Sequence, residues 1–153
     1  MGVNACYCLV AALLLAACVK PGPLEVRQYQ LRDQVPEEAD EPLVRMEKER
    51  RLHGAVSMEE RRGKLGQYYV LLWNDAENAG TGEVEVVLEY QQGASASRVK
   101  RMTRGFPSAD GKGKAEFAVI GDDYFKNGRV LAWKATLSRG KRVIATRKSY
   151  LWE

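Results

Sequence analysis

The sequence predicts a small antiparallel β-sandwich, an all-β domain over residues 64–153, with a small open barrel as the alternative. Three observations favour this fold class. From Leu65 onward, β-branched and aromatic residues fall in short runs that Gly, Asn and Asp interrupt. Several runs alternate apolar and polar residues, which is typical of a strand with one buried face. About six or seven such runs fit into roughly 90 residues, the strand density of a sandwich.

The first expected element is an export signal over residues 1–17. Residues 9–17 form an apolar run of about nine residues, too short to span a membrane but long enough for a signal-peptide core. The run closes with Leu-Ala-Ala-Cys at residues 15–18, which resembles the lipobox of bacterial lipoproteins. The resemblance implies cleavage before Cys18 and lipidation of its thiol and amino group. Two or three acyl chains then give permanent membrane anchoring, because each buried CH₂ contributes about 0.8 kcal/mol.

The residues around this motif set the expected location. Val19 and Lys20 follow Cys18, with no Asp of the kind that retains enterobacterial lipoproteins at the inner membrane. The resemblance therefore implies a bacterial cell envelope, and an outer membrane with the chain facing the periplasm or the surface. Residues 1–7 contain no Lys or Arg, which departs from the usual basic start of a signal peptide. The alternative is a buried apolar helix that includes Cys18 as a small core residue.

Two segments are expected between the anchor and the sandwich. Residues 18–41 contain several prolines and an acidic cluster, and they are interpreted as a flexible linker. Residues 42–63 are expected to form a helical arm, because Pro42 suits a first helical turn, Gly54 suits a left-handed stop, and Ser57 begins a capping box. The arm is interpreted as a cover for one edge or end of the domain, with a partner-docking segment as the alternative.

The sandwich is expected to contain strands near residues 67–74, 82–91, 97–104, 113–120, 129–138 and 141–152. The first of these is apolar on both faces from Tyr68 to Trp73, so we expect it to be covered on both sides. The turn at residues 138–141 joins the last two strands into a hairpin. This architecture resembles immunoglobulin-like and fibronectin type III-like sandwiches, without a cysteine pair or a diagnostic motif.

The candidate binding residues are basic and aromatic. The net charge of +4 is too small and too interspersed to predict nucleic-acid binding. Two expected strands are nevertheless basic, with Arg98, Lys100, Arg101 and Arg104 on the third and Lys141, Arg142, Arg147 and Lys148 on the last. Side by side, they would form a cationic face for phosphorylated lipid headgroups, acidic glycans or an acidic partner. Protection of sheet edges against aggregation is the simpler role for the same charges.

The tryptophans offer a second candidate surface. Trp73, Trp133 and Trp152 would form a stacking platform for sugar rings if they were exposed together. Core packing is favoured for them, and Trp152 is expected to be the most exposed because it lies next to the terminus.

Residues for catalysis are scarce. His53 is the one histidine, the cysteines all lie within the first eighteen residues, and no phosphate-loop, dinucleotide, zinc-protease or nucleophile-elbow motif occurs. Asp122 and Asp123 are adjacent and are interpreted as turn residues. The sequence thus predicts no enzyme, no cofactor and no metal site.

The leading hypothesis is a lipid-anchored envelope protein with a non-enzymatic interaction or structural module, whose partner is another envelope protein. The alternatives are a glycan- or cell-wall-binding lipoprotein and a carboxylate hydrolase using Asp122, Asp123 or Glu89.

Overall fold

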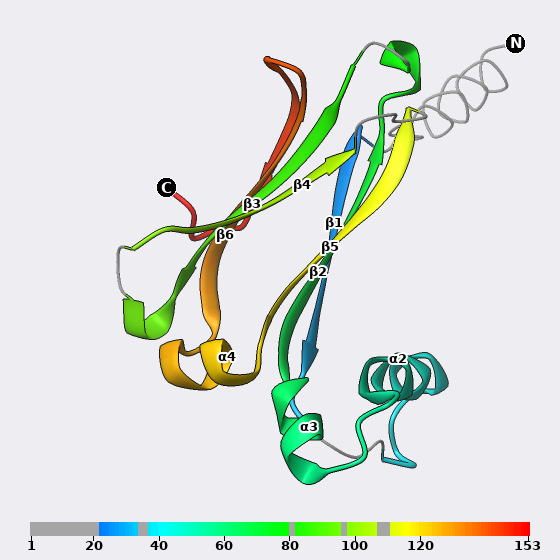
Figure 1. Ribbon diagram of the computed structural model, residues 1–153, viewed down its shortest axis with the longest axis vertical. Coiled ribbons are helices and arrows are strands. Elements are labelled where there is room, and N and C mark those ends of the chain that lie inside the picture. The colour runs from blue at the N-terminus through cyan, green and yellow to red at the C-terminus, as the bar shows by residue number, and fades with distance from the viewer. Residues whose placement is uncertain (1–21, 34–36, 80–81, 96–97, 107–110) are drawn as a thin grey trace, which may run out of the picture.

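The computed structural model describes residues 22–33, 37–79, 82–95, 98–106 and 111–153. In them, strands form two antiparallel sheets that pack face to face (Figure 1). The three-stranded sheet has the order β1-β2-β5, and the four-stranded sheet has the order β4-β3-β6-β7. The strands are β1 Leu24–Leu31, β2 Gly66–Asn74, β3 Val84–Gln92, β4 Lys100–Phe106, β5 Lys112–Ile120, β6 Val130–Arg139 and β7 Arg142–Lys148. The fold is the predicted β-sandwich, and its sheets do not close into a barrel.

The helices gather at one end of the sandwich (Figure 1). They are α2 Pro42–Leu52, α3 Met58–Gly63 and α4 Gly121–Asn127, and the 3₁₀ turn η2 Gly93–Ser95 contacts α4. The 3₁₀ turn η1 Ala76–Asn78 follows β2 at the opposite end of the sandwich. The expected signals are confirmed: Pro42 opens α2, and Gly54 after it has φ +79°. The capping box of α3 is confirmed as well. The Ser57 hydroxyl accepts from the Glu60 N–H at 3.1 Å, and the Glu60 carboxylate accepts from the Ser57 N–H at 2.8 Å.

The expected linker over residues 18–41 is corrected by β1, which pairs with β2 along its whole length, from Leu24 opposite Trp73 to Leu31 opposite Gly66. The sandwich therefore starts before residue 64, and the helices of residues 42–63 connect its first two strands rather than precede it. The sequence hides this strand because its apolar face changes midway. Leu24 faces the space between the sheets, whereas Leu31 packs outside the three-stranded sheet.

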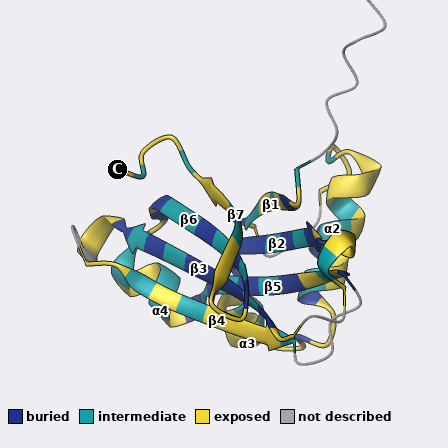
Figure 2. Ribbon diagram, turned by 90° about the horizontal axis from the view of Figure 1, so that it is seen from above, coloured by how far each residue is buried: buried dark blue, intermediate teal, exposed yellow. Residues whose placement is uncertain are grey.

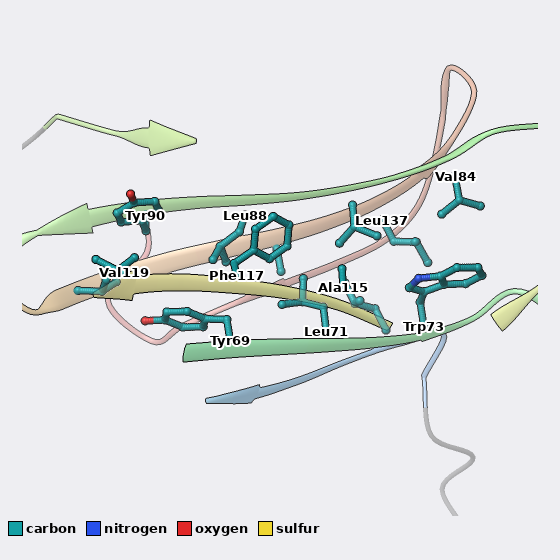
Figure 3. Close-up of a cluster of buried hydrophobic side chains, with 14 residues drawn as sticks. Tyr69, Leu71, Trp73, Val84, Leu88, Tyr90, Ala115, Phe117, Val119 and Leu137 are labelled. Carbon is teal, nitrogen blue, oxygen red and sulfur yellow. The ribbon is translucent and has the colours of Figure 1, made fainter. Parts of the chain in front are cut away.

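The core fills the space between the two sheets (Figure 3). Its members are the inward residues of every described strand except β4 and β7, which contribute only partly buried side chains. The fully buried ring of Tyr69 packs edge-on against Trp133, with 6.0 Å between centroids. Burial raises the pKa of Tyr90 to about 12 and also raises the pKa of Tyr69, so both hydroxyls remain neutral. Along β3 and β5, buried residues alternate with less buried ones over most of the strand, as expected from the alternating apolar and polar runs of the sequence.

A second apolar cluster lies outside the three-stranded sheet, where Leu52 of α2 and Leu65 pack on Leu31 and Tyr68. Inside the same sheet, Tyr69 and Leu71 belong to the main core. The prediction that this strand is covered on both sides is confirmed, and α2 is the cover on the outside.

Two local expectations differ from the structure. The last strand ends at Lys148, because the chain turns at residues 149–152, where the Trp152 N–H donates to the Ser149 carbonyl at 3.1 Å. Residues 121–127 form the helix α4 rather than an irregular turn, with the acidic pair in its first turn. Gly128, with φ +79°, ends this helix in a conformation that glycine adopts without strain.

Candidate functional site

The candidate interaction surface lies where β4 and β5, each an edge strand of its own sheet, line one hollow of about 600 Å³. We call this hollow the edge cleft. Most of β4 is exposed (Figure 2). An edge strand pairs on one side only, so half of its backbone N–H and C=O groups point away from its sheet. The cleft is lined by Met102, Thr103, Arg104, Glu116, Phe117, Ala118, Tyr68 and Arg51.

Arg51 is the cationic residue that α2 contributes to the edge cleft. Its side chain is only 6% exposed, and Nε lies 2.7 Å from Oε1 of Glu47 as an ion pair. The guanidinium carbon lies 3.9 Å from the ring centroid of Tyr68, within the range of a cation–π contact. Tyr68 is fixed in turn, because its hydroxyl donates to the Lys64 carbonyl at 2.5 Å. Burial raises the pKa of this hydroxyl, so Tyr68 stays neutral beneath the guanidinium.

Glu116 is the acidic residue that lines the edge cleft. The Lys114 ammonium lies 2.8 Å from its Oε1. This hydrogen bond lowers the pKa of the Glu116 carboxyl against a smaller opposing effect of burial, and Arg50 and Arg51 lower it further. The carboxylate is therefore ionised at neutral pH and already has a cation beside it.

The predicted basic residues of β4 differ in their contacts. Lys100 pairs with Asp123 at 2.5 Å. Arg98, Arg101 and Arg104 have no ion pair or hydrogen bond from their side chains to any residue that the structure describes. Arg104 is exposed and lines the edge cleft, so it supplies an uncompensated positive charge at that place.

The two basic strands do not lie side by side, so they form no continuous cationic face. The second basic strand is β7, and the strand order places β3 and β6 between it and β4. Lys134 of β6 pairs with Glu89 of β3 at 2.6 Å, so an ion pair separates the two basic strands on this sheet. Sequence patterning gives the charge of each strand but not the strand order, and the two strands lie at opposite edges.

The tryptophans do not form a platform. Trp73 is 4% exposed and lies in the core, and Trp133 packs against that core. Trp152 is partly exposed and lies beside Lys134, whose ammonium is 5.3 Å from its ring centroid. Lys134 pairs with Glu89 across the sheet, and Glu89 belongs to the solvent-facing row of β3, so Trp152 lies on the outer face. The core packing favoured for Trp73 and Trp133 is observed, and Trp152 stands alone.

The acidic residues considered for hydrolysis each have a basic partner. Asp122 is 2.7 Å from Lys126, a hydrogen bond that lowers the pKa of its carboxyl. Asp123 pairs with Lys100 and Glu89 with Lys134, and none of the three lines the edge cleft. Within the described ranges, no group of three or more His, Cys, Asp or Glu residues is placed to hold a metal ion.

One buried polar pair was not found from the sequence. Arg139, at the end of β6, donates from Nε to Asp75 at 2.9 Å and from Nη1 to the Gly82 carbonyl at 3.0 Å. Both side chains of the ion pair are almost completely buried, at 4% and 6% exposure. Neither residue belongs to a motif, and their 64-residue separation in the chain gives no local signal. The pair is structural, since it joins the end of β2 to the end of β6.

Two expectations concern the membrane. The export signal and the lipidation site at Cys18 lie outside the described residues. In the described part of the chain, no helix has the length and apolar character needed to cross a bilayer. No known family model, curated protein or solved structure matches this sequence.

Proposed function

We propose that this chain is a lipid-anchored protein of the bacterial cell envelope, and that its sandwich is a non-enzymatic interaction module that docks a partner in the edge cleft. The observation that carries the docking role is the cleft itself. It combines two free strand edges with the unpaired Arg104 and with apolar side chains, Met102 and Phe117, in one hollow. A groove of this composition suits binding better than catalysis, because the carboxylates considered for chemistry are paired elsewhere.

The partner that fits is an extended, acidic protein segment. An extended segment adds as a strand to a free sheet edge through main-chain hydrogen bonds, while pockets beside the edge accept alternate side chains. Arg104 favours acidic residues in that segment, because it has no ion-pair partner in the described residues, whereas Arg51 is paired with Glu47 and Glu116 with Lys114. The other envelope partner that the sequence suggested, a glycan, has less support, since the three tryptophans lie apart.

The anchor is supported by the residues at 15–18 and by the position of β1. A lipobox-like sequence that closes an apolar run is a specific signal, and Leu24, where the sandwich begins, follows Cys18 closely. Such an arrangement holds a domain at a membrane surface. The outer membrane is the proposed location because Asp does not follow Cys18.

The likeness to immunoglobulin-like and fibronectin type III-like domains is also part of the proposal. Its support is a three-stranded antiparallel sheet packed on a four-stranded one, with the connections β2–β3, β4–β5 and β5–β6 crossing between them. Folds of this class serve as binding scaffolds, which agrees with a docking role.

The anchor is tested by intact-mass analysis of the protein from its native membrane fraction, beside a Cys18→Ser variant. We expect a chain that begins at an acylated Cys18, and we expect the variant to remain unprocessed. An unacylated chain that retains Met1 would contradict the proposed location.

The docking surface is tested with a photocrosslinking amino acid in place of Thr103, in cells. Thr146 is the matched control position, because it lies on β7, the other edge strand of the same sheet. We expect one adduct of defined mass from position 103 and none from position 146. Arg104→Glu is expected to abolish the adduct, and Arg129→Glu, which reverses an exposed charge away from the cleft, is expected to preserve it. Equal adducts at both positions, or an adduct that Arg104→Glu leaves unchanged, would refute the docking role of the cleft.

A further inference from the structure

We infer that the end of the sandwich opposite the helices faces the lipid surface, and that the β6–β7 hairpin tip, Lys141–Val143, contacts anionic headgroups there. This inference rests on the proposed lipid anchor at Cys18. It assigns a membrane-contacting surface to one end of the domain and leaves the helical end facing away from the bilayer.

The chain enters the sandwich at that end. Leu24 lies opposite Trp73, near the end of β2, and the Pro23 carbonyl accepts from the Asn74 N–H at 2.9 Å. Asn74 in turn lies opposite Lys112, the first residue of β5. The tip between β6 and β7 belongs to the same end, since Arg139, just before it, donates from Nε to Asp75, the residue after Asn74, at 2.9 Å. Figure 1 shows α2, α3 and α4 at the other end.

The length of the tether restricts the orientation. Three residues lie between Cys18 and Gly22, and the four steps from Cys18 to Gly22 reach at most about 14 Å when the chain is fully extended. The nine residues of β2 extend roughly 30 Å from one end of the sandwich to the other. The helical end is therefore too far from the anchor to face the bilayer while the chain remains attached at Cys18.

The hairpin tip has the composition of a headgroup contact. Lys141 and Arg142 are exposed, and their side chains have no ion pair or hydrogen bond within the described ranges. Val143 beside them is 59% exposed. Lys112 is a third exposed cation at this end, while the exposed carboxylates there include Glu77, Glu83 and Glu25, which is paired with Arg27. Basic side chains next to an exposed apolar residue are attracted to anionic lipid and tolerate the interface.

The tip is also held rigidly. Gly140 has φ +55°, a conformation that glycine adopts without strain. Arg139, just before it, is fixed by Asp75 and the Gly82 carbonyl and is buried, so it is not one of the cations that lipid can reach. The contact therefore depends on Lys141 and Arg142, and the fold presents them without further ordering.

The test uses the full chain, processed and acylated in cells and reconstituted into vesicles of phosphatidylethanolamine and phosphatidylglycerol. Cys6, Cys8 and Cys18 are the natural cysteines, so an introduced cysteine is the only free thiol of the mature acylated protein. A fluorophore is attached through Val143→Cys at the tip, or through Glu59→Cys in α3 at the helical end, and is quenched by spin-labelled lipid. We expect at least fivefold stronger quenching at position 143 than at position 59.

The headgroup contact is tested with charge reversals. Lys141→Glu combined with Arg142→Glu is expected to lower quenching at position 143 at least twofold in vesicles with phosphatidylglycerol, and to have no effect in vesicles of phosphatidylcholine alone. Arg98→Glu combined with Arg101→Glu is the matched control, since it reverses two exposed, unpaired arginines near the other end of the sheet.

Flotation and the mass of the chain separate the two proposals. An acylated chain that floats with the vesicles, but whose label is quenched equally at both positions, would overturn the orientation and leave the anchor intact. A chain that lies on its side would quench a Thr146→Cys label as strongly as the tip, which also contradicts the inference. An unacylated chain that does not float would overturn both the anchor and the orientation.

Discussion

The two open sides of the sandwich have different chemistry. On the side of β1 and β7, hydrogen bonds cross from one sheet to the other. Arg147 donates from Nε to the Leu24 carbonyl at 3.1 Å, and Trp133 donates from Nε1 to the Gln28 side chain at 3.3 Å. On the side of β4 and β5, Arg104 has no such partner in the part of the chain that the structure describes. The side of β1 and β7 is closed by its own residues, whereas that of β4 and β5 remains free for a partner.

The hollows reflect the same difference. One hollow beside β1 and β7 has a volume of about 320 Å³, roughly half that of the edge cleft, and Arg147 and Trp133 form part of its walls. Another, of about 480 Å³, lies between Pro23, the turn after β2 and residues Arg142, Val143 and Ile144 of β7. Basic residues on an edge strand thus have two different uses in one domain. Arg147 joins two sheets, and Arg104 has its charge available for a ligand.

Both open sides depend on the stability of the whole sandwich, and the largest expected effect is a loss of unfolding free energy. Asp75→Ala leaves Arg139 buried without a counter-ion, which costs about 3–5 kcal/mol of unfolding free energy. Chemical denaturation followed by tryptophan fluorescence measures this loss. Asp122→Ala, which removes an exposed partner of Lys126, is the control and is expected to leave stability unchanged. Equal unfolding free energies for the two variants would contradict the structural importance of the buried pair.

Two arginine variants distinguish the two open sides by their effect on the unfolding free energy. Arg147→Ala removes a cross-sheet hydrogen bond and is expected to lower the unfolding free energy by about 0.5–1.5 kcal/mol. Arg104→Ala is expected to change it by less than about 0.5 kcal/mol, because this side chain touches no partner in the described structure. The crosslink at position 103 is expected to respond in the opposite way, with loss in Arg104→Ala and retention in Arg147→Ala. If Arg104→Ala is the more destabilising variant, the edge cleft is a structural contact and not a docking surface.

The sequence predicted the fold better than the candidate site, for physical reasons. Strands β3, β5 and β6 have one face in the core along most of their length, so their apolar residues recur with period two and are visible in the sequence. β1 is not visible in this way, because Leu24 belongs to one apolar cluster and Leu31 to the other. Capping signals were accurate at Ser57 and Gly54, since they depend only on neighbouring residues.

The site could be predicted only in part. The basic character of β4 was evident, and Arg98, Arg101 and Arg104 lack partners in the described part of the chain, as a binding strand requires. The contribution of Arg51 to the same hollow depends on how α2 packs against the sheet, which no local pattern encodes. Strand order was also beyond the sequence, and for that reason the sequence left open whether the two basic strands lie side by side.

The smallest expected effect concerns α2, which contributes Arg51 to the lining of the edge cleft. Lys48 of α2 is almost fully buried and lies 2.8 Å from Asp40. Its hydrogen bond, helped by the Glu37 N–H, lowers the pKa of the Asp40 carboxyl below its usual value near 4. The unfolded chain therefore binds this proton at higher pH than the folded one. The contact stabilises α2 above about pH 4, and its contribution is lost as the pH falls through the folded pKa.

This pH dependence is measurable at Leu52, which joins α2 to the sheet. We expect its methyl NMR signals to move as the pH falls below about 4 and α2 loosens, and we expect Asp40→Asn to remove this step. Asp122→Asn is the matched control, because the pKa of Asp122 is also lowered by a lysine, but at a site away from α2. Because Arg51 lies on the same helix, crosslinking at position 103 is expected to weaken in Asp40→Asn while crosslinking at position 146 stays absent. If the Leu52 signals titrate identically in Asp40→Asn and the unmodified chain, the Asp40–Lys48 contact does not fix the position of α2. The edge cleft then depends on β4 and β5 and not on this contact.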